Sequence, residues 1–65
     1  MLLEEIKDKY RPDELWVELH QDSHKVHVFT GPMDDAETLY THDFGTMKVA
    51  KAIARAIGVP VVKFI

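Results

Sequence analysis

An amphipathic segment near the end of the chain, residues 46–57, most constrains how this chain can fold. At 100° per residue, one face collects four apolar residues at the helical spacing i, i+3, i+4, i+7: Ala50, Ile53, Ala54 and Ile57. Thr46 can cap the first turn of such a helix, and Gly58 suits the left-handed conformation that ends one. Residues 59–65 are few and largely β-branched. The segment therefore predicts a helix followed by a terminal strand.

Two alternating segments, residues 15–20 and 25–30, predict a β-hairpin around a loop at residues 21–24. In that register, position 16 pairs with 29, 18 with 27 and 20 with 25. One face then carries only apolar residues, which must face the core: Leu15, Val17, Leu19, Val26 and Val28. A slip of one residue would mix the apolar and polar sets, so the pattern specifies the register.

The remaining segments predict one more helix and one more strand. Residues 2–10 predict a short helix that ends before Pro12, because the residue preceding a proline is driven out of the helical region. Residues 37–44 predict a third strand, and a short helix over residues 32–40 is the alternative. Alternation along that strand puts Leu39 and Thr41 on one face and three larger side chains on the other: Tyr40, His42 and Phe44.

The fold class that follows is α+β, a small two-layer domain with the order α-β-β-β-α-β. We expect an antiparallel meander with the second helix packed on one face and the last strand at an edge, in a single domain over residues 1–65. A chain this short buries a thin core, and without cysteine it has neither disulfides nor a thiolate metal site to reinforce it. No apolar run approaches the ~20 residues that cross a bilayer. We therefore expect a soluble cytoplasmic protein that does not use a membrane.

Charge is distributed unevenly along the chain. Residues 1–43 hold all eleven acidic residues and four basic ones, whereas residues 44–65 hold four basic residues and no acidic one. Such asymmetry bears on association, and it predicts an acidic surface that meets a basic partner. The acidic residues that we expect to contact the partner are Glu4, Glu5, Asp8, Asp13, Glu14, Glu18, Asp22, Asp34, Asp35 and Glu37.

Residues capable of catalysis or metal binding form no recognisable motif. Ser23 is the single serine, and its neighbours in the tight turn diverge, so we expect no enzyme and name no catalytic residue. His20 and His27 lie near Glu18 in the predicted register, but the fixed spacings of metal motifs are missing. We therefore expect no metal and no cofactor. A Glu18–His27 pair or a histidine-dependent response to pH accounts for the same residues.

Trp16 and Phe29 face each other on the second face of the predicted hairpin. If that face is bare, the pair is a large aromatic contact open to water, which small proteins usually reserve for a docking partner. If the N-terminal helix folds over it, the pair is part of the core. The sequence leaves both arrangements open.

A stripe of three basic residues lies opposite the apolar face of the 46–57 helix: Lys48, Lys51 and Arg55. The element order, with Lys48-Val49-Ala50-Lys51-Ala52 opening the last helix, resembles the double-stranded-RNA-binding domain, whose second helix starts with a lysine-rich and alanine-rich segment. The resemblance implies RNA binding through this stripe. However, the first helix is acidic here, a final strand is added and the net charge is −3, which disfavours phosphate binding at physiological salt.

We therefore interpret the sequence as a non-enzymatic protein-interaction module with an acidic surface and Trp16 and Phe29 as its aromatic centre. Its partner would be a protein with a basic surface, such as a nucleic-acid-handling complex. In size and charge the chain is similar to small inhibitors that bacteriophages and mobile elements make against RNA polymerase or CRISPR systems. The alternative is a nucleic-acid-binding module that uses the basic stripe. An unpaired edge strand also leaves a homodimer open.

Overall fold

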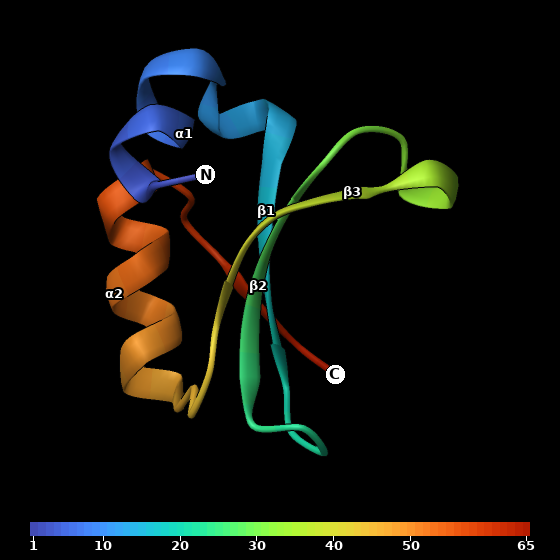
Figure 1. Ribbon diagram of the computed structural model, residues 1–65, viewed down its shortest axis with the longest axis vertical. Helices are drawn as coiled ribbons and strands as arrows, with labels where there is room; N and C mark the ends of the chain where they lie inside the picture. Colours follow the sequence, from blue (N-terminus) through green and yellow to red (C-terminus); the bar gives the residue numbers. More distant parts are fainter.

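The computed structural model describes residues 1–65 and confirms the predicted order of elements (Figure 1). The regular elements and two 3₁₀ turns are, in chain order, α1 (Leu3–Lys9), η1 (Pro12–Glu14), β1 (Leu15–His20), β2 (Lys25–Thr30), η2 (Met33–Asp35), β3 (Glu37–His42), α2 (Met47–Ile57) and β4 (Val62–Phe64). The α+β class and the α-β-β-β-α-β order are therefore correct. The alternative helix at residues 32–40 reduces to the single turn η2.

The four strands form one sheet in the order β3-β2-β1-β4. The hairpin has the predicted register, with Trp16 opposite Phe29, Glu18 opposite His27 and His20 opposite Lys25. β3 pairs antiparallel with β2, which completes the meander. β4 instead runs parallel to β1, so the sheet is mixed. Its parallel direction follows from α2, which carries the chain back across the sheet before the last strand begins.

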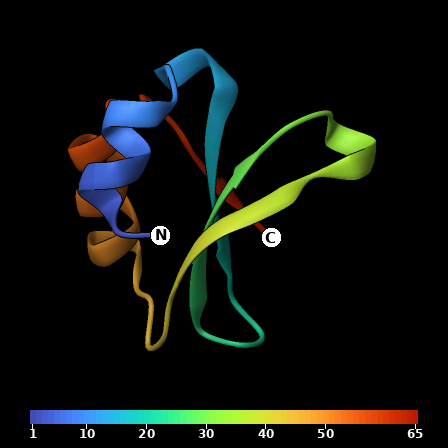
Figure 2. The ribbon, with the colours of Figure 1, turned by 45° about the horizontal axis from the view of Figure 1, so that its top comes forward.

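Both helices lie on the same face of the sheet (Figures 1 and 2). Ile6 is the fully buried residue of α1, and α1 packs beside α2. The core is one cluster of twelve side chains: Ile6, Leu15, Val17, Leu19, Val26, Val28, Leu39, Ala50, Ile53, Ala54, Ile57 and Val59. The apolar faces predicted for the hairpin and for α2 therefore meet each other. Leu2 precedes α1 and is 68% exposed, so the predicted start of that helix is one residue too early.

β3 departs from the predicted alternation. Its ladder with β2 contains a register shift between Val28 and Phe29, where Val28 pairs with Tyr40 and Phe29 with Thr38. The extra residue is Leu39. The predicted alternation puts Leu39 on the opposite face from Tyr40, but in the structure Leu39 is buried in the core. The prediction for Leu39 was wrong because a β-bulge adds one residue to one strand and changes which side chains face inward.

The turn between β3 and α2 ends the third strand two residues earlier than predicted. Phe44 has φ +60° and is 86% exposed, so it lies in a turn rather than in a strand. Gly45 donates a hydrogen bond to the carbonyl of His24 at 2.6 Å, and a side chain there would overlap Val26. Glycine is required at this position because the turn passes directly against β2.

The ends of α2 follow the predicted chemistry. The Thr46 hydroxyl accepts a hydrogen bond from the Val49 N–H at 3.2 Å, and Gly58 has φ +78° at the C-terminal end. Neither α1 nor α2 has the length and apolar character needed to cross a membrane.

Candidate interaction surface on the open sheet face

The face of the sheet opposite the helices carries a cluster of aromatic, histidine and charged side chains from β1 and β2. We call it the open face, and its central residues are Trp16, Glu18, His20, Lys25, His27 and Phe29. Each of the six is partly exposed. α1 packs on the other side of the sheet, so it does not cover Trp16 and Phe29 (Figure 2). Of the two arrangements that the sequence left open, the structure has the exposed one.

Trp16 and Phe29 form a stacked pair at one end of the open face. Their ring centroids are 5.6 Å apart, with 24° between the ring planes. The Lys63 ammonium lies 5.5 Å from the centroid of the Trp16 ring, within cation–π range. The sulfur of Met33, from η2, lies 3.9 Å from the same ammonium. The pair is thus flanked by β4 and η2 but keeps access to water.

Glu18 joins two neighbours on its own strand. Its carboxylate accepts a hydrogen bond from Trp16 Nε1 at 2.7 Å and contacts His20 Nε2 at 2.8 Å, and its side chain is 17% exposed. Burial alone would raise the pKa of Glu18, but the hydrogen bonds from Trp16 and His20 and the charges of His20 and Lys63 outweigh it and lower the pKa. Glu18 and His27 are cross-strand neighbours as predicted, but the hydrogen bonds of the carboxylate go to Trp16 and His20 on its own strand.

His27 occupies the middle of the open face. Its Nδ1 lies 2.9 Å from the Thr41 hydroxyl, and its ring meets that of His20 edge-on with centroids 4.7 Å apart. Burial, followed by the charges of His20 and Lys25, lowers the pKa of His27, although Glu18 and Asp43 oppose the shift. No group of three or more His, Asp and Glu side chains in the chain is arranged to hold a metal ion.

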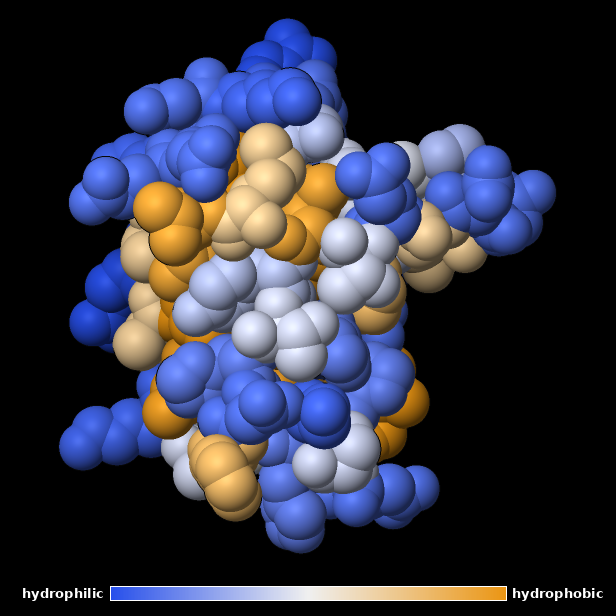
Figure 3. Space-filling view, viewed as in Figure 1, coloured by the Kyte–Doolittle hydropathy of each residue, from blue (hydrophilic) through white to orange (hydrophobic).

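Five of the predicted acidic contact residues lie on η1, on η2 and at the start of β3, the segments next to the strand ends that hold Trp16 and Phe29. Leu15 pairs with Thr30, Thr30 pairs with Glu37, and the Thr30 hydroxyl donates to the Glu14 carbonyl at 2.7 Å. The strand ends therefore lie between η1 and the start of β3, while η2 projects away from the rest of the sheet (Figure 1). We call the resulting set the acidic end: Asp13, Glu14, Asp34, Asp35 and Glu37. Figure 3 shows hydrophilic residues over η1 and over the projecting η2.

Of the other five predicted acidic residues, Glu18 lies on the open face and four lie outside it. Glu4, Glu5 and Asp8 are on α1, in the helix layer, and Asp22 is in the hairpin turn at the opposite end of the sheet. Arg11 lies 3.5 Å from Asp13 and 3.6 Å from Glu14, which partly offsets the charge of the acidic end. The ten predicted acidic residues thus do not form one patch.

The basic stripe of Lys48, Lys51 and Arg55 is exposed on α2, on the side of the molecule away from the open face. None of its three cations takes part in a salt bridge; the ion pairs of the chain involve other residues.

Comparison with known proteins gives no relative. No protein family, no curated protein and no solved structure matches the chain.

Two residues of the open face were not singled out from the sequence. Lys63 and Met33 belong to segments distant from the hairpin, and only the pairing of β4 with β1 and the position of η2 bring them to Trp16. Lys63 did leave a signal, because it interrupts the apolar residues of the last strand and so had to face away from the core.

Proposed function

We propose that the chain is a non-enzymatic protein-interaction module that binds a basic surface of a partner protein through Trp16, Phe29 and the acidic end. The observation that supports this most directly is the position of the aromatic pair. Neither helix covers the pair. It lies on β1 and β2, next to the strand ends from which the residues of the acidic end continue. The open face thus combines an aromatic centre with a charged rim.

That combination suits a specific and fast association. Carboxylates at the rim attract a basic partner at long range and raise the encounter rate, but exposed charges add little affinity by themselves. Affinity at protein interfaces comes largely from aromatic side chains that become fully desolvated near the centre. Trp16 is already fixed in position by Glu18 and Phe29, so little conformational entropy is lost when it is covered.

The partner class follows from the charge. A basic surface that normally holds DNA or RNA is complementary in charge to these carboxylates, so we propose that the module blocks a nucleic-acid-handling protein. An inhibitor made by a bacteriophage or a mobile element against RNA polymerase or a CRISPR complex fits the size and charge of the chain.

Affinity capture with matched variants tests this function. Wild type is compared with Trp16→Ala and with a triple variant that neutralises part of the acidic end, Asp34→Asn, Asp35→Asn and Glu37→Gln. The control removes three carboxylates from α1 instead: Glu4→Gln, Glu5→Gln and Asp8→Asn. We expect the wild-type chain to capture a protein that added DNA or RNA displaces. The control variant should capture the same protein, and neither open-face variant should capture it. Equal loss in the control would show that net charge matters rather than this surface.

A second function, nucleic-acid binding through the basic stripe, is favoured by one observation. Lys48, Lys51 and Arg55 are exposed and have no acidic partner, so they are available to phosphates. Binding of double-stranded RNA that weakens steeply with salt, and that is lost when all three are changed to Ala, would support it. Absence of binding at low salt would remove it.

A further inference from the structure

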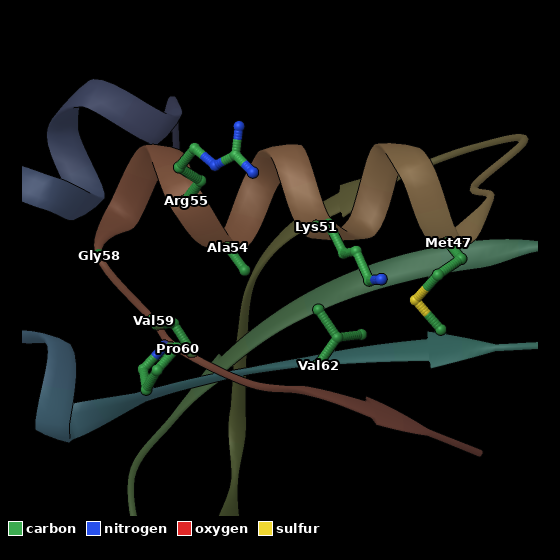
Figure 4. Close-up of a pocket in the computed structure, with 8 residues that line it drawn as sticks. All are labelled: Met47, Lys51, Ala54, Arg55, Gly58, Val59, Pro60 and Val62. Carbon is green, nitrogen blue, oxygen red and sulfur yellow. The ribbon is translucent and has the colours of Figure 1, made fainter.

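A groove separates α2 from β4, on the side of the molecule away from the open face (Figure 4). It has a volume of about 530 Å³ and an apolar floor and wall formed by Met47, Ala54, Val59, Pro60 and Val62. Figure 4 shows Lys51 and Met47 pointing from α2 toward β4, whereas Arg55 lies at the rim with its guanidinium turned away from the strand. The groove is thus apolar inside and cationic along its helical wall.

β4 forms one edge of the sheet and leaves backbone groups unpaired beside this groove. The Ile65 N–H donates to the Leu19 carbonyl at 2.9 Å, and the Ile65 carbonyl accepts from the Gln21 N–H at 3.1 Å. Because backbone groups alternate in direction along a strand, the N–H and C=O of Phe64 and Val62 point away from β1, where no further strand follows. An extended peptide can pair with these groups.

Apolar side chains continue along the same edge. Val61 is 63% exposed and Phe64 57% exposed, although both belong to the segment that completes the sheet. Phe64 pairs with Leu19 and so shares the face of Val62, on the side of α2. Exposed apolar residues beside unpaired strand groups are typical of sites where a further strand is added.

We propose that β4 and the groove bind an extended acidic peptide segment of another protein, which adds to the sheet as a fifth strand. Its backbone pairs with Val62 and Phe64, its apolar side chains enter the groove, and its carboxylates meet Lys51 and Arg55. Charge decides the nature of the occupant, because the two charged residues that line the groove, Lys51 and Arg55, are both basic and no acidic residue lines it. Because successive side chains of a strand point to opposite faces, only every second residue of the peptide faces the groove, and these residues include both apolar and acidic ones to meet the floor and the cations.

A second copy of the chain fits the same edge less well. Symmetric antiparallel pairing of two β4 strands would bring Lys51 and Arg55 of one copy toward those of the other, with no carboxylate from residues 44–65 between them. A bare polyanion would meet the cations but would use neither the apolar floor nor the unpaired N–H groups.

The test starts with a displayed library of random ten-residue peptides selected on the full chain. We expect the selected peptides to carry both apolar and acidic residues among every second position, on the side that faces the groove, and the best of them to shift the amide resonances of β4 and α2. Lys51→Glu should weaken binding about tenfold or more, whereas Lys7→Glu on α1 should not. Selected peptides without acidic residues, or a peptide whose shifts map to another surface, would overturn the proposal.

A matched pair of variants isolates strand addition. Phe64→Pro and Phe64→Ala both remove the ring, but only proline also removes the outward N–H, a change that edge strands tolerate. We expect the proline variant to bind about fivefold to tenfold more weakly than the alanine variant. Equal binding by the two variants would overturn strand addition. If Phe64→Pro does not fold, the same comparison can be made with the wild-type chain. A peptide N-methylated at every second backbone nitrogen is then compared with the unmethylated peptide.

The other occupants give distinct results. A concentration-dependent dimer that Phe64→Pro abolishes and Phe64→Ala retains would show that a second copy occupies the edge, and would overturn the proposal. So would binding of inorganic polyphosphate that competes with the peptide and is equal in both Phe64 variants. Because Trp16 contacts Lys63 of β4, the open face is tested separately with Phe29→Ala on β2, a strand that does not pair with β4, and this variant should leave peptide binding unchanged.

Discussion

The two faces of the hairpin differ in what holds them together. On the core face, Val17, Val26 and Val28 are fully buried within the hydrophobic cluster. On the open face, Trp16 and Glu18 are partly exposed and are held by one another and by His20. Burial of apolar area dominates folding free energy, whereas a partly exposed polar network contributes little. The core face therefore supplies most of the stability, and the open face contributes little to it.

Removing a core-face side chain should have the largest effect. Leu19 is 4% exposed, and Leu19→Ala should cost about 2–5 kcal/mol through lost burial and a residual cavity. A domain of this size has a total stability of roughly 3–10 kcal/mol, so the variant should lose a large part of its stability. Chemical denaturation followed by circular dichroism measures it. The adjacent open-face change His20→Ala should cost much less, and a similar cost at both positions would contradict the contrast between the faces.

The aromatic pair should show a smaller, specific coupling. Trp16→Ala and Phe29→Ala each remove part of a stacked contact, and a double-mutant cycle should give a coupling of about 0.5–1.5 kcal/mol. Both variants should remain folded, because neither side chain belongs to the buried cluster. Urea denaturation of wild type, both single variants and the double variant measures this. Additive effects would mean that the rings merely lie near each other.

Glu18 offers a test of the polar network with a still smaller effect. Glu18→Gln keeps the shape of the side chain but removes the charge that Trp16 and His20 contact, so it should cost about 1 kcal/mol at neutral pH. The lowered pKa of Glu18 means that its stabilisation is present above the ordinary value of 4.5 and is lost as the pH falls below it. Denaturation curves between pH 7 and 3 should therefore converge for wild type and variant. A constant difference over that range would contradict this role of the charge.

The sequence predicted the fold wherever one periodic pattern decided the structure. Alternation over residues 15–30 specified the register, and the spacing of Ala50 and Ile57 specified the buried face of α2, because a shift in either would place polar groups in the core. Leu39 escaped prediction because a bulge breaks the period of two without altering composition.

The open face was predicted only in part. Its central pairs followed from the register, but whether α1 covers them depends on how the Arg11–Pro12 connection directs the helix, which no pattern in residues 2–10 specifies. The same limit applies to the carboxylates. Asp34 and Asp13 are far apart in the sequence, and they reach the same end of the sheet only because β1 begins where β2 ends.

The smallest predicted effect is the change in stability with pH that His27 causes. It also tests whether burial or neighbouring charge lowers the pKa of His27. Because the pKa of His27 is lowered in the folded state, the unfolded chain takes up the proton first as the pH falls below about 7. The free energy of unfolding should therefore decrease with falling pH through the region around 6.5, and His27→Gln should flatten that slope. Burial is the largest cause and the charge of His20 the next, so His20→Gln should reduce the slope without removing it. If His20→Gln removed the whole slope, repulsion between the two imidazoles would be the cause, and the open face around His27 would be more accessible to water than its contact with Thr41 indicates.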